Sequence, residues 1–161
     1  MGAEEYRKVQ EMLGNQFGRA LTEVLRTMAG FELVVTDSDA VMTNCPAERV
    51  TGMILLTGSV HLLLSLTMTK ATLATLVSYM TGIPAFDLTE ADLGDGLLEL
   101  ANMTAGQTKT QLTDSGYRFQ ITAPFGITGG DYQIISKERV PQMEKGYLAE
   151  NMELLLRIFK I

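Results

Sequence analysis

The chain has 161 residues, of which 46% are hydrophobic and 20% charged, a composition typical of a globular protein with a sizeable core. We expect residues 1–161 to form a single domain. The formal net charge of −6 argues against binding to nucleic acid or to an anionic membrane surface, because both favour basic faces. A cytoplasmic location is predicted, because Cys45 is the sole cysteine and the N-terminus lacks the apolar segment of a signal peptide.

The first half of the chain predicts a long helix followed by three strands. Apolar residues recur every three or four positions over residues 3–28, which is the repeat of an amphipathic helix. Residues 31–36 are typical of a short strand. Residues 50–57 and 60–68 flank Gly58–Ser59 and predict a β-hairpin with a type II′ turn. Both runs are apolar at most positions, which indicates that both faces of the sheet are covered, partly by helices.

The second half predicts further helices and strands. A helix over residues 70–80 follows the hairpin directly. Towards the C-terminus we predict paired strands at residues 117–123 and 131–136, a long loop at residues 137–150, and a final strand at residues 152–161. The tight hairpin indicates antiparallel pairing. The sequence therefore predicts an α+β fold in which a largely antiparallel sheet packs against helices.

The stretch from Asp87 to Leu112 predicts the helix that is most informative about function. Thr89, followed three residues later by Asp92, forms a capping-box pattern at its start. At about 100° per residue, one broad side carries apolar and small residues: Leu93, Leu97, Leu98, Leu100, Ala101, Thr104, Ala105 and Leu112. The other side carries a stacked row with the spacing i, i+4, i+7, i+11: Asp95, Glu99, Asn102 and Gly106.

This row of Asp95, Glu99, Asn102 and Gly106 has two interpretations. Carboxylates and amides on a helix face are commonly no more than a solvated surface. The functional interpretation is a contact site, where Gly106 leaves the helix backbone open to close approach by a partner.

Other chemistry is scarce in this sequence. One histidine, His61, and one cysteine cannot build the usual zinc sites or a serine hydrolase triad, and no glycine-rich phosphate loop is present. We therefore predict no metal site and assign any catalytic role to carboxylate and amide groups. The first helix also carries an amide, Asn15, but Met12 stands three residues before it in place of a glutamate. We predict one site rather than two.

The string from Asp95 to Gly106, with Glu99, Asn102 and the later Pro124, resembles the signature helix of the CheC/CheX family of chemotaxis phosphatases. The likeness extends along most of the chain, since residues before and after this helix resemble the family's opening helix, its hairpin and its final strand. CheC-type members carry two Glu/Asn sites and CheX-type members carry one, so the single motif here points to CheX.

Members of this family dephosphorylate CheY-like receiver domains, whose phosphoryl group lies on an aspartate beside bound Mg²⁺. The resemblance implies that Asn102 orients the attacking water, that Glu99 pairs with a receiver lysine, and that Asp95 tunes docking. It also implies no cofactor of the chain's own, since the receiver would supply Mg²⁺, and a homodimer made by joining sheets. The alternative is a non-catalytic module that binds a receiver domain or a flagellar-switch or signalling partner.

Overall fold

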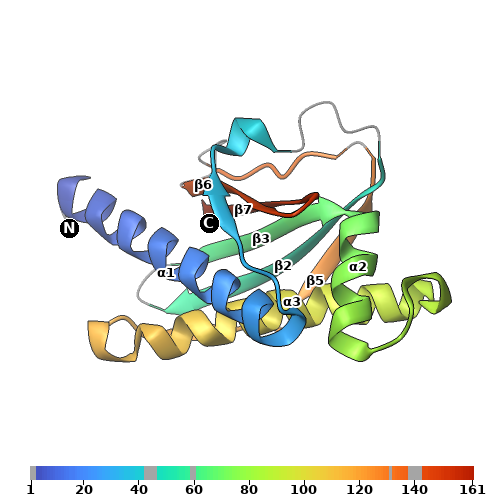
Figure 1. The fold of residues 1–161 in the computed structure, drawn as a ribbon. Coiled ribbons are helices and arrows are strands. Elements are labelled where there is room, and N and C mark those ends of the chain that lie inside the picture. Colours follow the sequence, from blue (N-terminus) through green and yellow to red (C-terminus); the bar gives the residue numbers. More distant parts are fainter. Residues whose placement is uncertain (1–2, 42–46, 59–60, 131, 138–142) are drawn as a thin grey trace.

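The computed structural model describes residues 3–41, 47–58, 61–130, 132–137 and 143–161, so Cys45 and Ser59 lie outside the described residues. Within these ranges, three α-helices pack with a seven-stranded sheet (Figure 1). The elements follow in chain order: α1 (Ala3–Ala29), β1 (Val34–Thr36), η1 (Ser38–Ala40), β2 (Arg49–Gly58), β3 (Leu62–Thr69), α2 (Lys70–Thr81), η2 (Ala85–Asp87), α3 (Glu90–Gln111), η3 (Thr113–Ser115), β4 (Phe119–Ile121), β5 (Phe125–Gly129), β6 (Met143–Ala149) and β7 (Met152–Lys160). None of the helices described here is long and apolar enough to cross a membrane.

The strands are joined in the order β1-β6-β7-β3-β2-β4, with β5 also paired to β2. Each of these pairings is antiparallel. The central hairpin of β2 and β3 has a register that runs from Arg49 opposite Thr69 to Leu56 opposite Leu62. The predicted α+β fold, with an antiparallel sheet packed against helices, is confirmed.

The main core lies between the helices and one face of the sheet. Alternate residues of the central strands point toward the helices, including the fully buried Ile54, and Leu156 lies on the same side. At Gly52 of β2, an added Cβ would lie 3.1 Å from the carbonyl oxygen of Leu97 and 3.3 Å from the Cβ of Ala101. Because this position has no side chain, α3 lies directly against the middle of the sheet.

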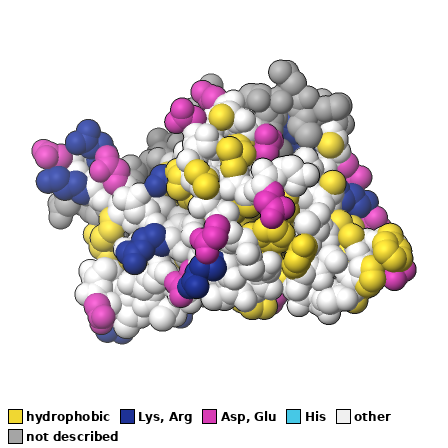
Figure 2. Space-filling model, in the orientation of Figure 1, with side chains coloured by type: hydrophobic (Ala, Val, Ile, Leu, Met, Phe, Trp, Pro, Cys, Tyr) yellow, Lys and Arg dark blue, Asp and Glu magenta, His cyan; other side chains and the backbone are white. Residues whose placement is uncertain are grey.

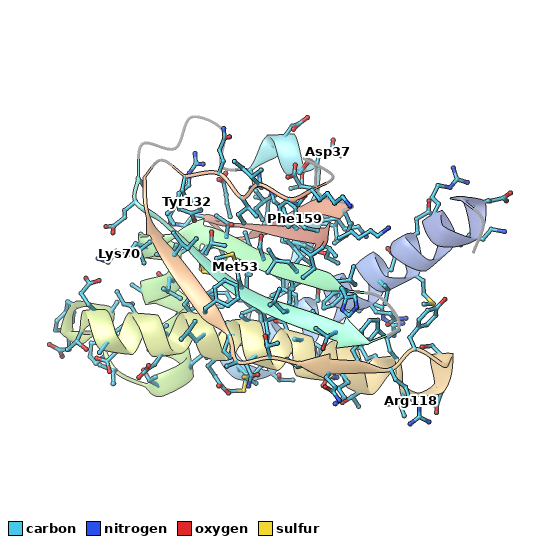
Figure 3. The ribbon with its side chains drawn as sticks, turned by 180° about the vertical axis from the view of Figure 1, so that it is seen from behind. Asp37, Met53, Lys70, Arg118, Tyr132 and Phe159 are labelled. Atoms are coloured by element: carbon cyan, nitrogen blue, oxygen red, sulfur yellow. The ribbon has the colours of Figure 1, made fainter. Side chains whose placement is uncertain are left out.

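The opposite face of the sheet carries a second apolar cluster. Met53, Leu63 and Phe159 are buried there, and Ile134 packs against them. The Tyr132 hydroxyl hydrogen-bonds the Thr51 hydroxyl of β2, and Figure 3 shows Tyr132, Met53 and Phe159 over the sheet. Residues 132–136 form no strand, so the predicted strand at 131–136 is wrong. Their alternating apolar residues serve to cover the sheet, while β4 and β5 each pair with β2.

The predicted loop at residues 137–150 is also wrong, because β6 occupies Met143–Ala149 between β1 and β7. Tyr147 faces the helices and is buried, whereas Glu144 faces the other side and forms an ion pair with Arg157. A Cβ at Gly146 would lie 2.7 Å from the carbonyl oxygen of Asp37, so glycine allows the chain before η1 to pass closely. The sequence of this strand did not predict it, because its polar residues and its glycine are uncommon in strands.

Candidate functional site

The start of α3 is fixed by polar contacts on both sides. The Thr89 side chain accepts a hydrogen bond from the Asp92 backbone N–H at 3.2 Å, and the Asp92 carboxylate accepts one from the Thr89 N–H at 2.8 Å. The Thr89 hydroxyl also donates to the Asp92 carboxylate, at 2.7 Å. The hydrogen bonds that this carboxylate accepts from the Thr89 hydroxyl and from the Thr89 N–H hold the pKa of Asp92 below its ordinary value. Lys70, the first residue of α2, lies 2.5 Å from the Glu90 carboxylate, and this hydrogen bond raises the pKa of Lys70. The predicted capping box is confirmed.

The buried side of α3 packs closely against its neighbours, because its side chains are small or form their hydrogen bonds within the helix. At Gly96, an added Cβ would overlap Val77 of α2, so this glycine is required by packing. Thr104 and Thr108 are fully buried, and their hydroxyls donate to the carbonyl oxygens four residues earlier, at 2.8 Å in both cases. With Ala101 and Ala105 also buried, α3 is held as a rigid support.

The exposed side of α3 carries the row of Asp95, Glu99, Asn102 and Gly106, which we call the α3 ridge. Asp95, Glu99 and Asn102 are exposed, and Gly106 is half-buried. Among the residues the structure describes, none gives these three side chains a hydrogen bond or an ion pair. The spacing therefore brings the predicted site residues to one accessible face, with their polar groups available to another molecule.

The glycines of α3 differ in whether packing inside the protein requires them. Gly96 is enforced by Val77, as described above, but a Cβ at Gly94 or at Gly106 would meet nothing within 4 Å. A glycine inside a helix costs about 0.5–1 kcal/mol relative to alanine. Among the described residues, no contact accounts for this cost at Gly106, which suits a place where another backbone or a bulky group approaches the helix.

Helix α1 does not supply a second site of the same kind. The Asn15 side-chain oxygen accepts a hydrogen bond from the Lys145 ammonium group of β6 at 2.7 Å. Glu11 lies 3.9 Å from Arg7 in an exposed ion pair. The amide of Asn15 is therefore engaged within the molecule, in contrast to the amide of Asn102.

Sequence reasoning missed the apolar border of the α3 ridge. Leu98 was assigned to the apolar side of α3 but is only half-buried, and its Cδ2 would lie 3.6 Å from a Cβ at Gly126 of β5. On β5 itself, Phe125 and Ile127 are 43% and 40% exposed. In the sequence, the one indication of this border is Phe125 and Gly126 directly after Pro124. That this segment lies beside α3 is seen in the fold.

No cluster of three His, Cys, Asp or Glu side chains within the described ranges is arranged to hold a metal ion. His61, the sole histidine, is exposed just before β3, and its carbonyl oxygen accepts a hydrogen bond from the Ile161 N–H at 3.2 Å. The chemistry that the α3 ridge offers is thus one amide and two carboxylates on the exposed side of the helix.

Comparison with known proteins agrees with this arrangement. Residues 50–144, more than half of the chain, match the family model described as chemotaxis phosphatase CheX. The fold is similar to CheX from Vibrio vulnificus, with a TM-score of 0.77, 23% identity and coverage of 91% of this chain and 95% of that one. It is also similar to CheX from Desulfovibrio desulfuricans, with a TM-score of 0.75, 24% identity and coverage of 93% of this chain and 99% of that one. A search of curated proteins finds no match.

A third similar structure is a CheX–CheY–BeF3–Mg²⁺ complex from Borrelia burgdorferi, with a TM-score of 0.69, 23% identity and coverage of 91% of this chain and 97% of that one. Sequence motif, family model and fold point in the same direction. The chain belongs to the CheX family of chemotaxis phosphatases.

Proposed function

We propose that this protein hydrolyses the aspartyl phosphate of a CheY-like response regulator docked on the α3 ridge. The observation that carries the proposal is the Asn102 amide, exposed and unbonded within the described structure, one turn beyond Glu99 on a rigidly packed helix. The CheX family assignment supports the reaction class. We infer that the reaction takes place in the cytoplasm.

Asn102 is suited to positioning a water molecule. Its amide can donate one hydrogen bond and accept another while remaining uncharged next to a phosphoryl anion. Phosphoryl transfer depends mainly on positioning and charge stabilisation, so a strong base is not required. The water oxygen bonds to phosphorus as the bond from phosphorus to the receiver carboxylate breaks. The carboxylate leaves with the electron pair, and the water proton passes to the released phosphate.

Glu99 and Asp95 would hold the receiver in register. An exposed carboxylate can pair with a lysine ammonium group of the receiver, and we assign this docking role to Glu99. Asp95, one turn earlier, would tune the docking, and Gly106 would admit the receiver close to the helix backbone. Mg²⁺ would come with the receiver, as supported by the similar complex that contains CheY, BeF3 and Mg²⁺.

We further propose a homodimer formed by joining sheets. The exposed apolar side chains Phe125 and Ile127 on β5 support this, because an edge strand with apolar residues favours pairing with another strand. Light scattering of the purified protein tests this part: a dimer is expected, and a monomer at all accessible concentrations would contradict it.

The test of the activity is the decay of a phosphorylated CheY-like receiver with Mg²⁺, in the presence and absence of this protein. The proposal expects faster phosphate release from at least one receiver of the same organism. If the protein binds a phosphorylated receiver and leaves its decay rate unchanged, the alternative of a binding module for a receiver or a flagellar-switch partner replaces the enzyme.

A further inference from the structure

A second surface, formed by α1, β1 and β6, has features that the phosphatase reaction does not use. A cavity of about 600 Å³ lies there, lined along α1 by Asn15, Arg19, Thr22 and Arg26, with Lys145 on β6 and Val35 on β1. We call it the α1 groove. Figure 2 shows Lys and Arg side chains on the face over α1, with acidic side chains beside them.

The charge of the α1 groove is opposite to that of the whole protein. None of the ion pairs found among the described residues involves Arg19, Arg26 or Lys145. The acidic residue of the groove, Glu23, is turned to α3, where its carboxylate accepts hydrogen bonds from Gln107 at 3.2 Å and Gln111 at 3.5 Å. A chain with a formal net charge of −6 thus presents three cations without ion pairs among the described residues, and one carboxylate, along one groove.

The floor of the groove holds the side chain of Tyr147. Tyr147 is only 1% exposed and lines the cavity, and its hydroxyl has no hydrogen bond to any other residue that the structure describes. Gly18 leaves the space that this hydroxyl occupies, since a Cβ there would overlap it. Burial raises the pKa of Tyr147 to about 12, so the phenol remains a hydrogen-bond donor at neutral pH. The hydroxyl is therefore a donor at the floor of the cavity, placed to meet an oxygen of a bound ligand.

The dimensions of the groove favour an extended chain. From Asn15 to Arg26 the helix rises about 16 Å, which matches about five residues of an extended strand. On the opposite wall, β1 lies at one end of the sheet order, and Val35 is 60% exposed. An edge strand offers unpaired backbone groups to an added strand.

We propose that the α1 groove binds an acidic, extended peptide segment of a protein partner, which lies beside β1 with carboxylates toward Arg19, Arg26 and Lys145 and an aliphatic side chain toward Val35. The Tyr147 hydroxyl donates to an oxygen of this segment. This surface lies on a different helix from the α3 ridge, and its function does not depend on the hydrolysis of a receiver phosphate.

Fluorescence anisotropy of a labelled heptapeptide, in which Asp or Glu alternates with Val, tests the proposal on the full chain. We expect saturable binding that weakens about tenfold or more in Arg19→Glu/Arg26→Glu, because like charges then face the peptide. Lys109→Glu/Arg118→Glu changes the net charge equally outside the groove and should alter binding less than about twofold. Tyr147→Phe should weaken binding several-fold without a change of charge.

Three results would overturn the assignment. One is the absence of saturable binding, or equal binding to a heptapeptide with Lys in place of the acids. Another is competition by citrate or inorganic phosphate as strong as that by unlabelled peptide, which would make this a small-anion site. The third is a dimer in light scattering that Arg19→Glu/Arg26→Glu converts to monomer, because the groove would then be covered by a second copy of the chain.

Discussion

Helices α1 and α3 present rows of the same spacing to the outside of the same core. Asn15, Arg19, Thr22 and Arg26 on α1 repeat the i, i+4, i+7, i+11 intervals of the α3 ridge. The α1 row is basic and lines a groove, whereas the α3 row is acidic and is exposed at its three polar residues. Spacing alone therefore defines a face of a helix, and the chemistry of that face depends on what each side chain already contacts.

The two asparagines show this difference most clearly. Asn15 accepts a hydrogen bond from Lys145 at 2.7 Å, while Asn102 has no such contact within the described part of the chain. Asn102 follows a glutamate by three residues, and Asn15 follows Met12. Of these two helices, α3 thus combines an amide that is free among the described residues with a neighbouring carboxylate.

The largest expected effect is the loss of turnover when the Asn102 amide is removed, compared with removal of the Asn15 amide. Asn102→Ala should lower turnover of a phosphorylated receiver about 100-fold or more, the usual cost of a group that acts on the reacting atoms. Its exposed position should keep the free energy of unfolding within about 0.5 kcal/mol of wild type. Asn15→Ala is the matched control and should retain wild-type turnover. Equal losses in both variants would remove the distinction between the helices.

The packing of Gly18 against Tyr147 in the α1 groove can be tested by a double-mutant cycle that measures the free energy of unfolding. Gly18→Ala should destabilise the protein by about 1–3 kcal/mol, because the new Cβ overlaps the Tyr147 hydroxyl. With Tyr147→Phe, the nearest remaining ring atom, Cζ, would lie 3.5 Å from that Cβ, an ordinary contact. The Gly18→Ala/Tyr147→Phe variant should therefore be at least as stable as Tyr147→Phe alone, because alanine also favours the helix. Additive losses would show that the hydroxyl does not occupy this space.

Glu99→Gln should raise the KM for a phosphorylated receiver about tenfold and leave kcat largely unchanged, because it removes a docking charge and no reacting group. Higher salt should raise KM in wild type more than in the variant. Asp114→Asn removes the same charge at an exposed position after α3 and serves as the control. A loss in kcat alone would instead place Glu99 in the chemical step.

The smallest expected effect concerns the two open glycines of α3. Gly106→Ala and Gly94→Ala should each stabilise the protein by up to about 1 kcal/mol, because neither new Cβ meets a neighbour and alanine favours the helix. Receiver affinity should fall in Gly106→Ala and stay unchanged in Gly94→Ala. Unfolding curves and receiver titrations would measure both, and equal affinities would show that the receiver does not approach Gly106.

The sequence predicted those elements whose local signals agree with their packing. Helix α3 has a capping box and a regular apolar face, so its start at Glu90 and its exposed row were both readable. Helix α2 is bounded by Thr69 and by Gly82, which adopts the left-handed conformation with φ of 75°. The hairpin of β2 and β3 is apolar over most of its length, which is typical of strands covered on both faces.

The sequence failed where a residue's role depends on distant segments. The β6 strand contains Glu144, Lys145 and Gly146, whose partners are Arg157, Asn15 and the backbone of Asp37, and no local pattern reveals them. Residues 132–136 alternate as a strand would, but they cover the sheet face instead of joining an edge. Likewise, the α1 groove needs β1 and β6 beside α1, which only the fold provides.

The most direct test of the central claim is to measure receiver binding and phosphate release on the same samples of wild type and Asn102→Ala. The Kd for a phosphorylated receiver and the single-turnover rate of phosphate release would be compared at saturating protein. If Asn102 orients the attacking water, the variant keeps a Kd close to wild type and loses most of the rate. A variant that loses affinity while the saturated rate stays at the wild-type value would contradict the account and make α3 a docking surface without a catalytic amide.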